Sequence, residues 1–170
     1  MCIRDSPENN YIGIDITAKV LILTKRNIDR AYAQAGREVD NVRILTHDIE
    51  RIRSMMGGGD RVSRIYINFC DPWPGNRHAK RRLTHGNFLR LYRQVLKMGG
   101  QIHFKTDNQP LFEFSVEEIP RFGFTLSEVT RDLHADGPVG VMTDYEAKFY
   151  GLGQPINRCV ATMEVGWVEP

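Results

Sequence analysis

The chain has 170 residues, of which 41% are hydrophobic and 26% are charged, and its formal net charge is +2. This balance is typical of one globular domain and excludes a disordered, collagen-like or coiled-coil chain. The three cysteines lack a C-x-x-C spacing and support neither a disulfide framework nor a zinc site. No apolar run approaches the roughly 18 residues of a membrane span. We therefore expect a cytoplasmic protein.

The first part of the chain alternates between strand-like and helix-like patterns. Strands are predicted over 11–16, 42–46 and 64–69, and helices over 17–36 and 48–56. The helix over 17–36 rests on apolar residues at helical spacing between a threonine cap and a glycine. The alternation indicates strand–helix units of the kind that build parallel sheets.

The second part of the chain continues the alternation. Helices are predicted over 84–97, 108–119 and 143–150, and strands over 101–105, 122–130 and 156–165. The first of these helices is expected to stop at Gly99 and Gly100. No linker divides the chain, so residues 11–170 are predicted to form a single α/β domain with a mostly parallel sheet, whose ligands bind at the carboxyl ends of the strands.

The charge is very unevenly distributed. The 35 residues between Asp71 and Asp107 contain no acid and eight Lys or Arg, a charge of +8, whereas the rest of the chain has 15 bases and 21 acids, a charge of −6. A concentrated positive segment is typical of a domain that binds a polyanion, because each neutralised phosphate releases condensed counterions. The alternative is a basic helix that simply faces solvent.

Two acids follow the first two predicted strands. Asp15 ends the first strand, and Asp48 follows the second. In nucleotide-binding sheets an acid at a strand end accepts hydrogen bonds from ribose hydroxyls. Each could equally cap the helix that follows it, and the sequence leaves both roles open.

The segment Asp71-Pro-Trp-Pro74 is less ordinary. Two prolines around a tryptophan fix the backbone where the chain leaves a strand, and a carboxylate beside a rigid aromatic ring can bind the edge of a planar base. The basic cluster follows at once and comprises Arg77, Lys80, Arg81 and Arg82. We expect these side chains to contact phosphates while the loop holds the reactive base. The alternative is a tryptophan buried in a tight structural turn.

Further acids lie near the ends of later strands. Asp107 closes the strand over 101–105, and the run Thr143, Asp144, Tyr145, Glu146 opens a late helix. These acids could be capping groups. Together, Asp71, Asp107 and Glu146 are expected to bring carboxylates to one rim of the sheet.

Three sequence segments, in the order in which they occur along the chain, resemble those of a known family. They are Asn68–Leu83, Phe104–Asn108 and Thr143–Phe149, the last followed by Gly153–Arg158. Their sequences and spacing resemble those of the bacterial tRNA (guanine-N7-)-methyltransferase family over about residues 10–163. The resemblance implies a Rossmann-like class I methyltransferase fold, S-adenosylmethionine as cofactor, and guanine 46 of tRNA as substrate, bound by a monomer or a homodimer.

The resemblance also implies roles for single residues. Asp15, Asp48 and Asp71 correspond to cofactor-binding acids, and Asp71 is also implicated in catalysis. Asp107 and the run from Thr143 to Glu146 correspond to substrate-binding positions. This chain has Gly75-Asn76 where the family usually has a lysine that contacts substrate, and Arg77 or Lys80 would compensate.

The start of the chain departs from the family. A first strand and a glycine-rich cofactor loop are expected before Tyr11, but residues 1–10 are too short to hold them, and Met1–Ser6 resembles sequencing adapter. We therefore expect that the chain is truncated, that its start is irregular or non-native, and that a central strand is missing. Such a chain should bind the cofactor weakly. The alternative is a natural start. Two other functions stay open, a non-catalytic tRNA-binding fragment and a nucleic-acid methyltransferase directed at amino groups.

Overall fold

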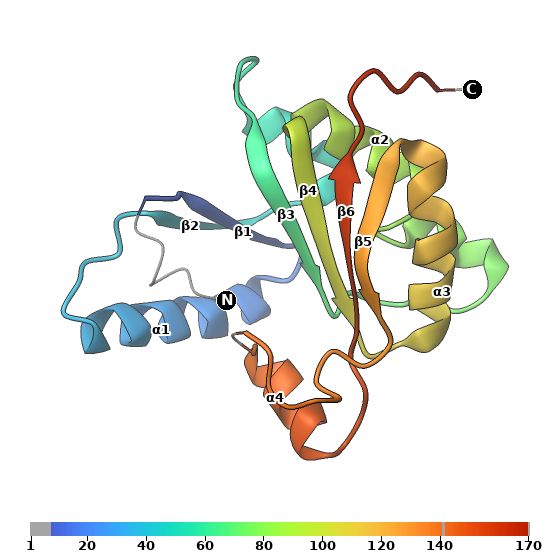
Figure 1. The fold of residues 1–170 in the computed structure, drawn as a ribbon. Helices are drawn as coiled ribbons and strands as arrows, with labels where there is room; N and C mark the ends of the chain where they lie inside the picture. The colour runs from blue at the N-terminus through green and yellow to red at the C-terminus, as the bar shows by residue number, and fades with distance from the viewer. Residues whose placement is uncertain (1–7, 141, 170) are drawn as a thin grey trace. The chain divides into compact units, whose positions relative to one another are not determined.

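The computed structural model describes residues 8–140 and 142–169 (Figure 1). Two compact units make up the chain, Met1–Gly57 and Gly58–Pro170. The expected irregular start over 1–10 falls mostly outside the described residues. That residues 11–170 form a single domain stays a prediction.

The first unit is a parallel strand pair with one long helix. It contains β1 (Tyr11–Asp15), α1 (Ala18–Gln34), β2 (Val42–Thr46) and η1 (Ile49–Met55). β1 and β2 pair in register from Tyr11 opposite Val42 to Asp15 opposite Thr46. Because the strands are parallel, their carboxyl ends lie side by side and bring Asp15 and Asp48 to the same end of the pair.

The second unit is built on a four-stranded sheet in the order β3-β4-β6-β5 (Figure 1). The strands are β3 (Val62–Asn68), β4 (Leu96–Thr106), β5 (Phe124–Thr130) and β6 (Asn157–Met163). β3 pairs with β4 in parallel, and β6 is antiparallel to both of its neighbours, so β3, β4 and β5 run in one direction. Within the described residues, β1 is hydrogen-bonded only to β2, and β3 only to β4.

Helices complete the second unit. They are η2 (Asn76–Arg81), α2 (Gly86–Val95), α3 (Gln109–Glu118), η3 (Ile119–Phe122) and α4 (Asp144–Gly151). Along β4, Ile102 and Phe104 are fully buried, whereas His103 between them is partly exposed. Phe104 stacks on Phe112 of α3, so the buried face of the sheet is the one that α3 covers.

The α/β fold expected from the sequence is confirmed, with two local differences. The helix predicted over 84–97 ends at Val95, because Leu96 is already extended and buried, and β4 starts there opposite Val62. The helix predicted over 48–56 is a 3₁₀ helix that is interrupted at Arg51. Burial of Leu96 against the sheet outweighs the glycine signal that suggested a later helix end.

Candidate active site

The loop that follows β3 has an unusual backbone. Phe69 and Trp73 have positive φ angles of 53° and 42°, and Gly75 has a φ of 85°. A left-handed conformation costs free energy for residues with a Cβ and persists only where the surroundings hold it. The amide of Phe69 donates to the main-chain oxygen of Lys105 at 2.9 Å, which fixes the loop's start to the end of β4.

Two arginines of the basic cluster contact this loop. Arg82 is only 9% exposed, its Nε and Nη2 donate to the main-chain oxygen of Trp73 at 3.3 and 3.2 Å, and its guanidinium lies 4.4 Å from the ring centre of Phe114. The guanidinium of Arg81 lies 4.8 Å from the ring centre of Trp73. These side chains therefore support the Asp71–Pro74 loop. Arg77, Lys80 and Arg81 are exposed, but Arg81 lies over the Trp73 ring, so within the cluster Arg77 and Lys80 are better placed to meet a phosphate backbone.

The first turn of α4 lies at the end of β4, close to Asp107. Partial burial and the nearby Asp107 carboxylate raise the pKa of Tyr145. The ring centre of Tyr145 lies 4.8 Å from that of Phe69 and 4.5 Å from that of Phe149, on which it stacks. An exposed aromatic ring thus stands beside a carboxylate at the carboxyl ends of β3 and β4.

Glu146 follows Tyr145 but is completely buried. Its Oε1 accepts from Lys105 Nζ at 2.7 Å and from His134 Nε2 at 3.0 Å, and its Oε2 accepts from the Thr143 amide at 3.3 Å. Burial raises the pKa of the Glu146 carboxyl, but hydrogen bonding and the charge of Lys105, with help from Thr143 and His134, outweigh burial and hold this pKa below its usual range.

The two acids of the first unit have local partners. Asp15 Oδ1 accepts from the amide of Thr17, the residue before α1, at 2.6 Å, and Asp48 Oδ1 accepts from the Glu50 amide at 2.9 Å as the N-cap of η1. Both side chains are only partly buried. Since each carboxylate has a second oxygen, these local hydrogen bonds are compatible with binding a cofactor, and the cofactor role stays a prediction.

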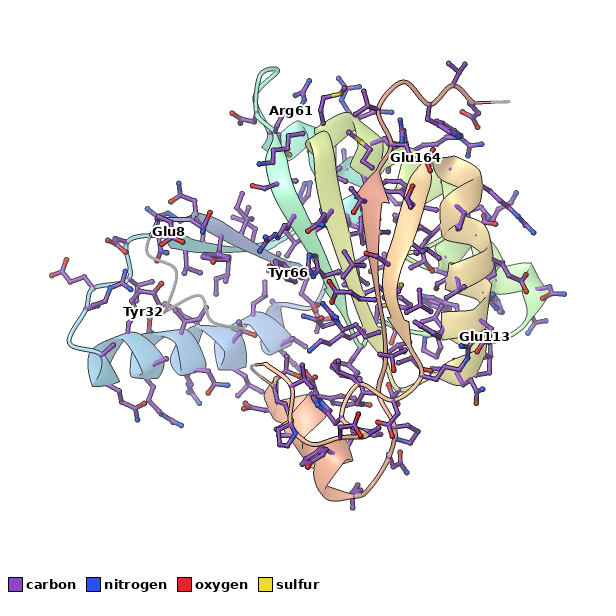
Figure 2. All side chains as sticks on the ribbon, in the orientation of Figure 1. Glu8, Tyr32, Arg61, Tyr66, Glu113 and Glu164 are labelled. Carbon is purple, nitrogen blue, oxygen red and sulfur yellow. The ribbon has the colours of Figure 1, made fainter. Side chains whose placement is uncertain are left out.

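Several residues near the site carried no signal in the sequence. His134, in the segment before α4, is buried against Glu146, and Phe69 packs on Tyr145. Tyr66, labelled in Figure 2, extends from β3, and its ring centre lies 5.0 Å from that of His103. Tyr66 and His103 lie opposite each other on β3 and β4, so the pairing of these strands could have indicated their contact. His134 and Phe69 contact residues of α4, and no strand pairing indicates those contacts.

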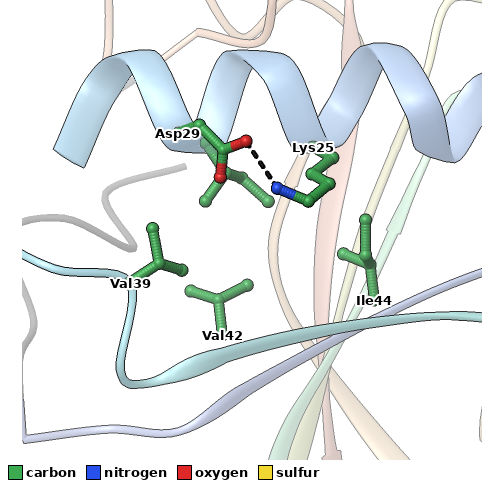
Figure 3. Close-up of a pocket in the computed structure, with 6 residues that line it drawn as sticks. Lys25, Asp29, Val39, Val42 and Ile44 are labelled. Atoms are coloured by element: carbon green, nitrogen blue, oxygen red, sulfur yellow. Dashed lines mark hydrogen bonds and ion pairs between the residues drawn. The ribbon is translucent and has the colours of Figure 1, made fainter. Parts of the chain in front are cut away.

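A pocket lies elsewhere, in the first unit, between α1 and β2 (Figure 3). Its volume is about 240 Å³, and it is lined by Lys25, Ile28, Asp29, Val39, Val42 and Ile44. Lys25 and Asp29 form an ion pair of 2.6 Å across one turn of α1. The walls are otherwise aliphatic, and none of the candidate site residues lines this pocket.

Comparison with known proteins identifies the family. Residues 3–159 match a family model described as "Putative methyltransferase". The chain is 46% identical over 158 residues to a tRNA (guanine-N(7)-)-methyltransferase of Clostridium perfringens (strain SM101 / Type A), covering 92% of this chain and 72% of that protein. The chain belongs to the tRNA (guanine-N(7)-)-methyltransferase family. A tRNA (guanine-N(7)-)-methyltransferase of Bacillus subtilis (strain 168) is 42% identical over 165 residues, covering 96% of this chain and 72% of that protein.

Solved structures support the fold of this tRNA (guanine-N(7)-)-methyltransferase family member. A precorrin-6y C5,15-methyltransferase from Geobacter metallireducens GS-15 has a TM-score of 0.58 at 13% identity, covering 92% of this chain and 69% of that chain. A SAM-dependent O-methyltransferase from Thermotoga maritima has a TM-score of 0.56 at 15% identity, and the match covers 94% of this chain and 52% of that chain. The expected methyltransferase fold is thereby confirmed. No helix within residues 8–140 and 142–169 has the length and apolar character to cross a membrane.

Proposed function

We propose that the protein transfers a methyl group from S-adenosylmethionine to N7 of guanine 46 in tRNA, and that it does so in the cytoplasm. The observation that carries this proposal is the 46% identity to a tRNA (guanine-N(7)-)-methyltransferase over 158 residues. The geometry supports it, because the Asp71–Pro74 loop, Asp107 and Tyr145 all follow or face the carboxyl ends of two adjacent parallel strands. Ligands of open α/β sheets bind at such ends.

The residues of the first unit suit the cofactor chemically. Asp15 ends β1, Asp48 follows the parallel strand β2, and carboxylate oxygens accept hydrogen bonds from ribose hydroxyls and from an adenine amino group. We assign these two acids to the nucleoside part of the cofactor, and we assign Asp71 to cofactor binding as well. When bound, S-adenosylmethionine supplies an electrophilic methyl group.

The acceptor atom determines what the protein must do. Guanine N7 has an in-plane lone pair and no proton, so no side chain has to remove one before attack. The carboxylates of Asp71 and Asp107 can accept hydrogen bonds from the N1 and N2 donors of guanine. The same negative charges stabilise the positive charge that develops on the ring as the methyl group arrives. Catalysis then depends mainly on orientation, which supplies several kcal/mol when the reacting atoms are held in line.

The remaining substrate contacts fall to α4 and to the basic cluster. Tyr145 is 45% exposed beside Asp107, so its ring can contact the face or edge of a base. Thr143 and Asp144 begin the same helix and lie at the same rim. Arg77 and Lys80 are assigned to tRNA phosphates, which position the nucleic acid without reading its sequence.

Product analysis tests the proposal. Unmodified tRNA is incubated with the enzyme and isotopically labelled S-adenosylmethionine, digested to nucleosides, and compared with standards of N7-methylguanosine, N2-methylguanosine and N6-methyladenosine. We expect the label in N7-methylguanosine alone. Label in either amino-methylated nucleoside would favour a methyltransferase directed at amino groups, and tRNA binding without any transfer would favour a non-catalytic binding protein.

A further inference from the structure

Glu146 occupies a position that a substrate cannot reach. Its side chain has an exposed fraction of 0% although it lies in the first turn of a helix whose neighbouring residue, Tyr145, is 45% exposed. A buried carboxylate is costly unless it is paired and hydrogen-bonded. Here it is paired, and the pairing involves residues far apart in the sequence.

The three partners of Glu146 come from three segments. Lys105 is the penultimate residue of β4, His134 lies in the segment before α4, and Thr143 is the residue that caps α4. Thr143 Oγ1 also accepts from the amide of Glu146 at 3.1 Å, which completes a reciprocal capping box. Glu146 therefore joins the start of α4 both to the sheet and to the preceding loop.

The histidine contact is oriented by the backbone. His134 Nδ1 accepts from the Val139 amide at 3.1 Å, which leaves the ring proton on Nε2, where it donates to Glu146 Oε1. With Lys105 donating to the same oxygen, Oε1 has two donors and Oε2 has the Thr143 amide. The carboxylate is satisfied by the protein itself, so a substrate contact would have to displace one of these partners.

What the cluster fixes is the position of α4 at the rim. Lys105 is two residues from Asp107 in sequence, and its main-chain oxygen accepts from the Phe69 amide. Tyr145, adjacent to Glu146, lies against Phe69 and close to Asp107. Anchoring Glu146 to Lys105 thus sets the distance between the tyrosine ring, the Asp107 carboxylate and the loop that leads to Asp71.

We propose that Glu146 is a positioning residue, which with Lys105 and His134 holds α4 so that Tyr145 and Asp107 face the substrate together, and that it does not touch the substrate. This role differs from the substrate contact that the family resemblance implied for Glu146. The positioning role of Glu146 rests on the proposed function in one respect, namely that the substrate is a guanine of tRNA.

Glu146→Gln tests the proposal with little change in volume. The amide retains one acceptor oxygen, but its NH₂ group faces donors, so the contacts to Lys105, His134 and Thr143 cannot all be kept. Glu117→Gln is the matched control, because Glu117 is an exposed glutamate on α3 away from the rim. We expect Glu146→Gln to lower kcat by about tenfold or more while KM for tRNA stays within about twofold. The control should leave both parameters unchanged.

Amide hydrogen exchange provides a readout that does not depend on activity. In Glu146→Gln, the amides of residues 144–151 should exchange faster than in the wild type, whereas those of α3 should not. If the wild-type protein fails to methylate guanine, the proposed function is wrong, and the exchange experiment still tests whether Glu146 holds α4. Unchanged exchange over 144–151 would overturn the proposal.

The kinetic results separate the remaining roles. A rise of about tenfold in KM for tRNA with unchanged kcat and unchanged exchange would make Glu146 a substrate contact and overturn the proposal. A lower melting temperature with unchanged kcat per folded enzyme would reduce Glu146 to a structural residue and also overturn it. If Glu146→Gln does not fold, Lys105→Met removes one partner of the same carboxylate, and the same fall in kcat with faster exchange over 144–151 is expected.

Discussion

Arg82 donates from Nε and Nη2 to the main-chain oxygen of Trp73, while its guanidinium lies over the ring of Phe114. A residue of the most basic segment of the chain thus has a buried structural contact. The carbonyl it contacts belongs to a residue with a φ of 42°, which the chain adopts only when held there. The shape of the Asp71–Pro74 loop therefore depends on a residue that charge alone would assign to tRNA.

Replacing Arg82 tests this dependence. Arg82→Ala leaves the Trp73 oxygen without its donors, and we expect the free energy of unfolding to fall by about 1–3 kcal/mol. Arg82→Lys should recover little of this stability, because an ammonium cannot reproduce the planar donor pair and the ring stacking. Urea denaturation measures the change, with Arg77→Ala, on the exposed face of η2, as the stability control. Equal stability of Arg82→Ala and the wild type would show that the contact does not hold the loop.

Asp71→Ala should abolish methyl transfer and leave tRNA affinity within a few-fold. The carboxylate is assigned to the guanine and the cofactor, whereas the phosphate contacts lie elsewhere. Single-turnover transfer and a filter-binding titration on the same preparation separate the two effects. Wild-type turnover by this variant would show that the role assigned to Asp71 is wrong.

The salt dependence of tRNA binding distinguishes the members of the basic cluster. Replacing Arg77 and Lys80 with alanine should lower the slope of log K against log salt concentration by about 0.7–0.9 for each phosphate that the protein no longer neutralises. Arg82→Ala should leave the slope unchanged, because this side chain is directed at Trp73. Binding isotherms at several salt concentrations measure the slopes. A slope unaffected by the Arg77 and Lys80 changes would place both side chains on a merely solvated surface.

The ionisation of Glu146 should contribute to the pH dependence of stability. Lys105 and His134 face its carboxylate, and its folded-state pKa is held below the ordinary value of 4.5. A depressed carboxyl pKa stabilises the fold above the unfolded-state pKa, and this contribution is lost as pH falls through the folded-state pKa. The stability difference between wild type and Glu146→Gln should therefore shrink as pH is lowered below 4.5. A pH-independent difference in urea denaturation would contradict this account.

Much of the fold could be predicted because the signals were local. The apolar run over 42–46 matches β2, and helical periodicity between Thr17 and Gly36 matches α1 within two residues at each end. The end of α2 could not be predicted from the glycines, because burial of Leu96 in the sheet decided it.

The candidate site was predictable in its residues and less so in their roles. The T-x-x-E spacing of Thr143 and Glu146 is that of a capping box, which is what the structure contains. Burial of Glu146 depends on Lys105 and His134, which are 41 and 12 residues away, and no local pattern indicates such neighbours. Charge alone could not distinguish Arg82, which is buried, from Lys80, which is exposed.

The most direct test of the account replaces a single atom of the substrate. In tRNA that carries 7-deazaguanosine at position 46, a carbon replaces N7, while the N1 and N2 donors assigned to Asp71 and Asp107 remain. We expect this tRNA to bind as tightly as the unmodified one and to accept no methyl group from labelled S-adenosylmethionine. Methyl transfer to the 7-deaza tRNA at the rate of the unmodified tRNA would contradict the proposal that N7 of guanine 46 is the acceptor.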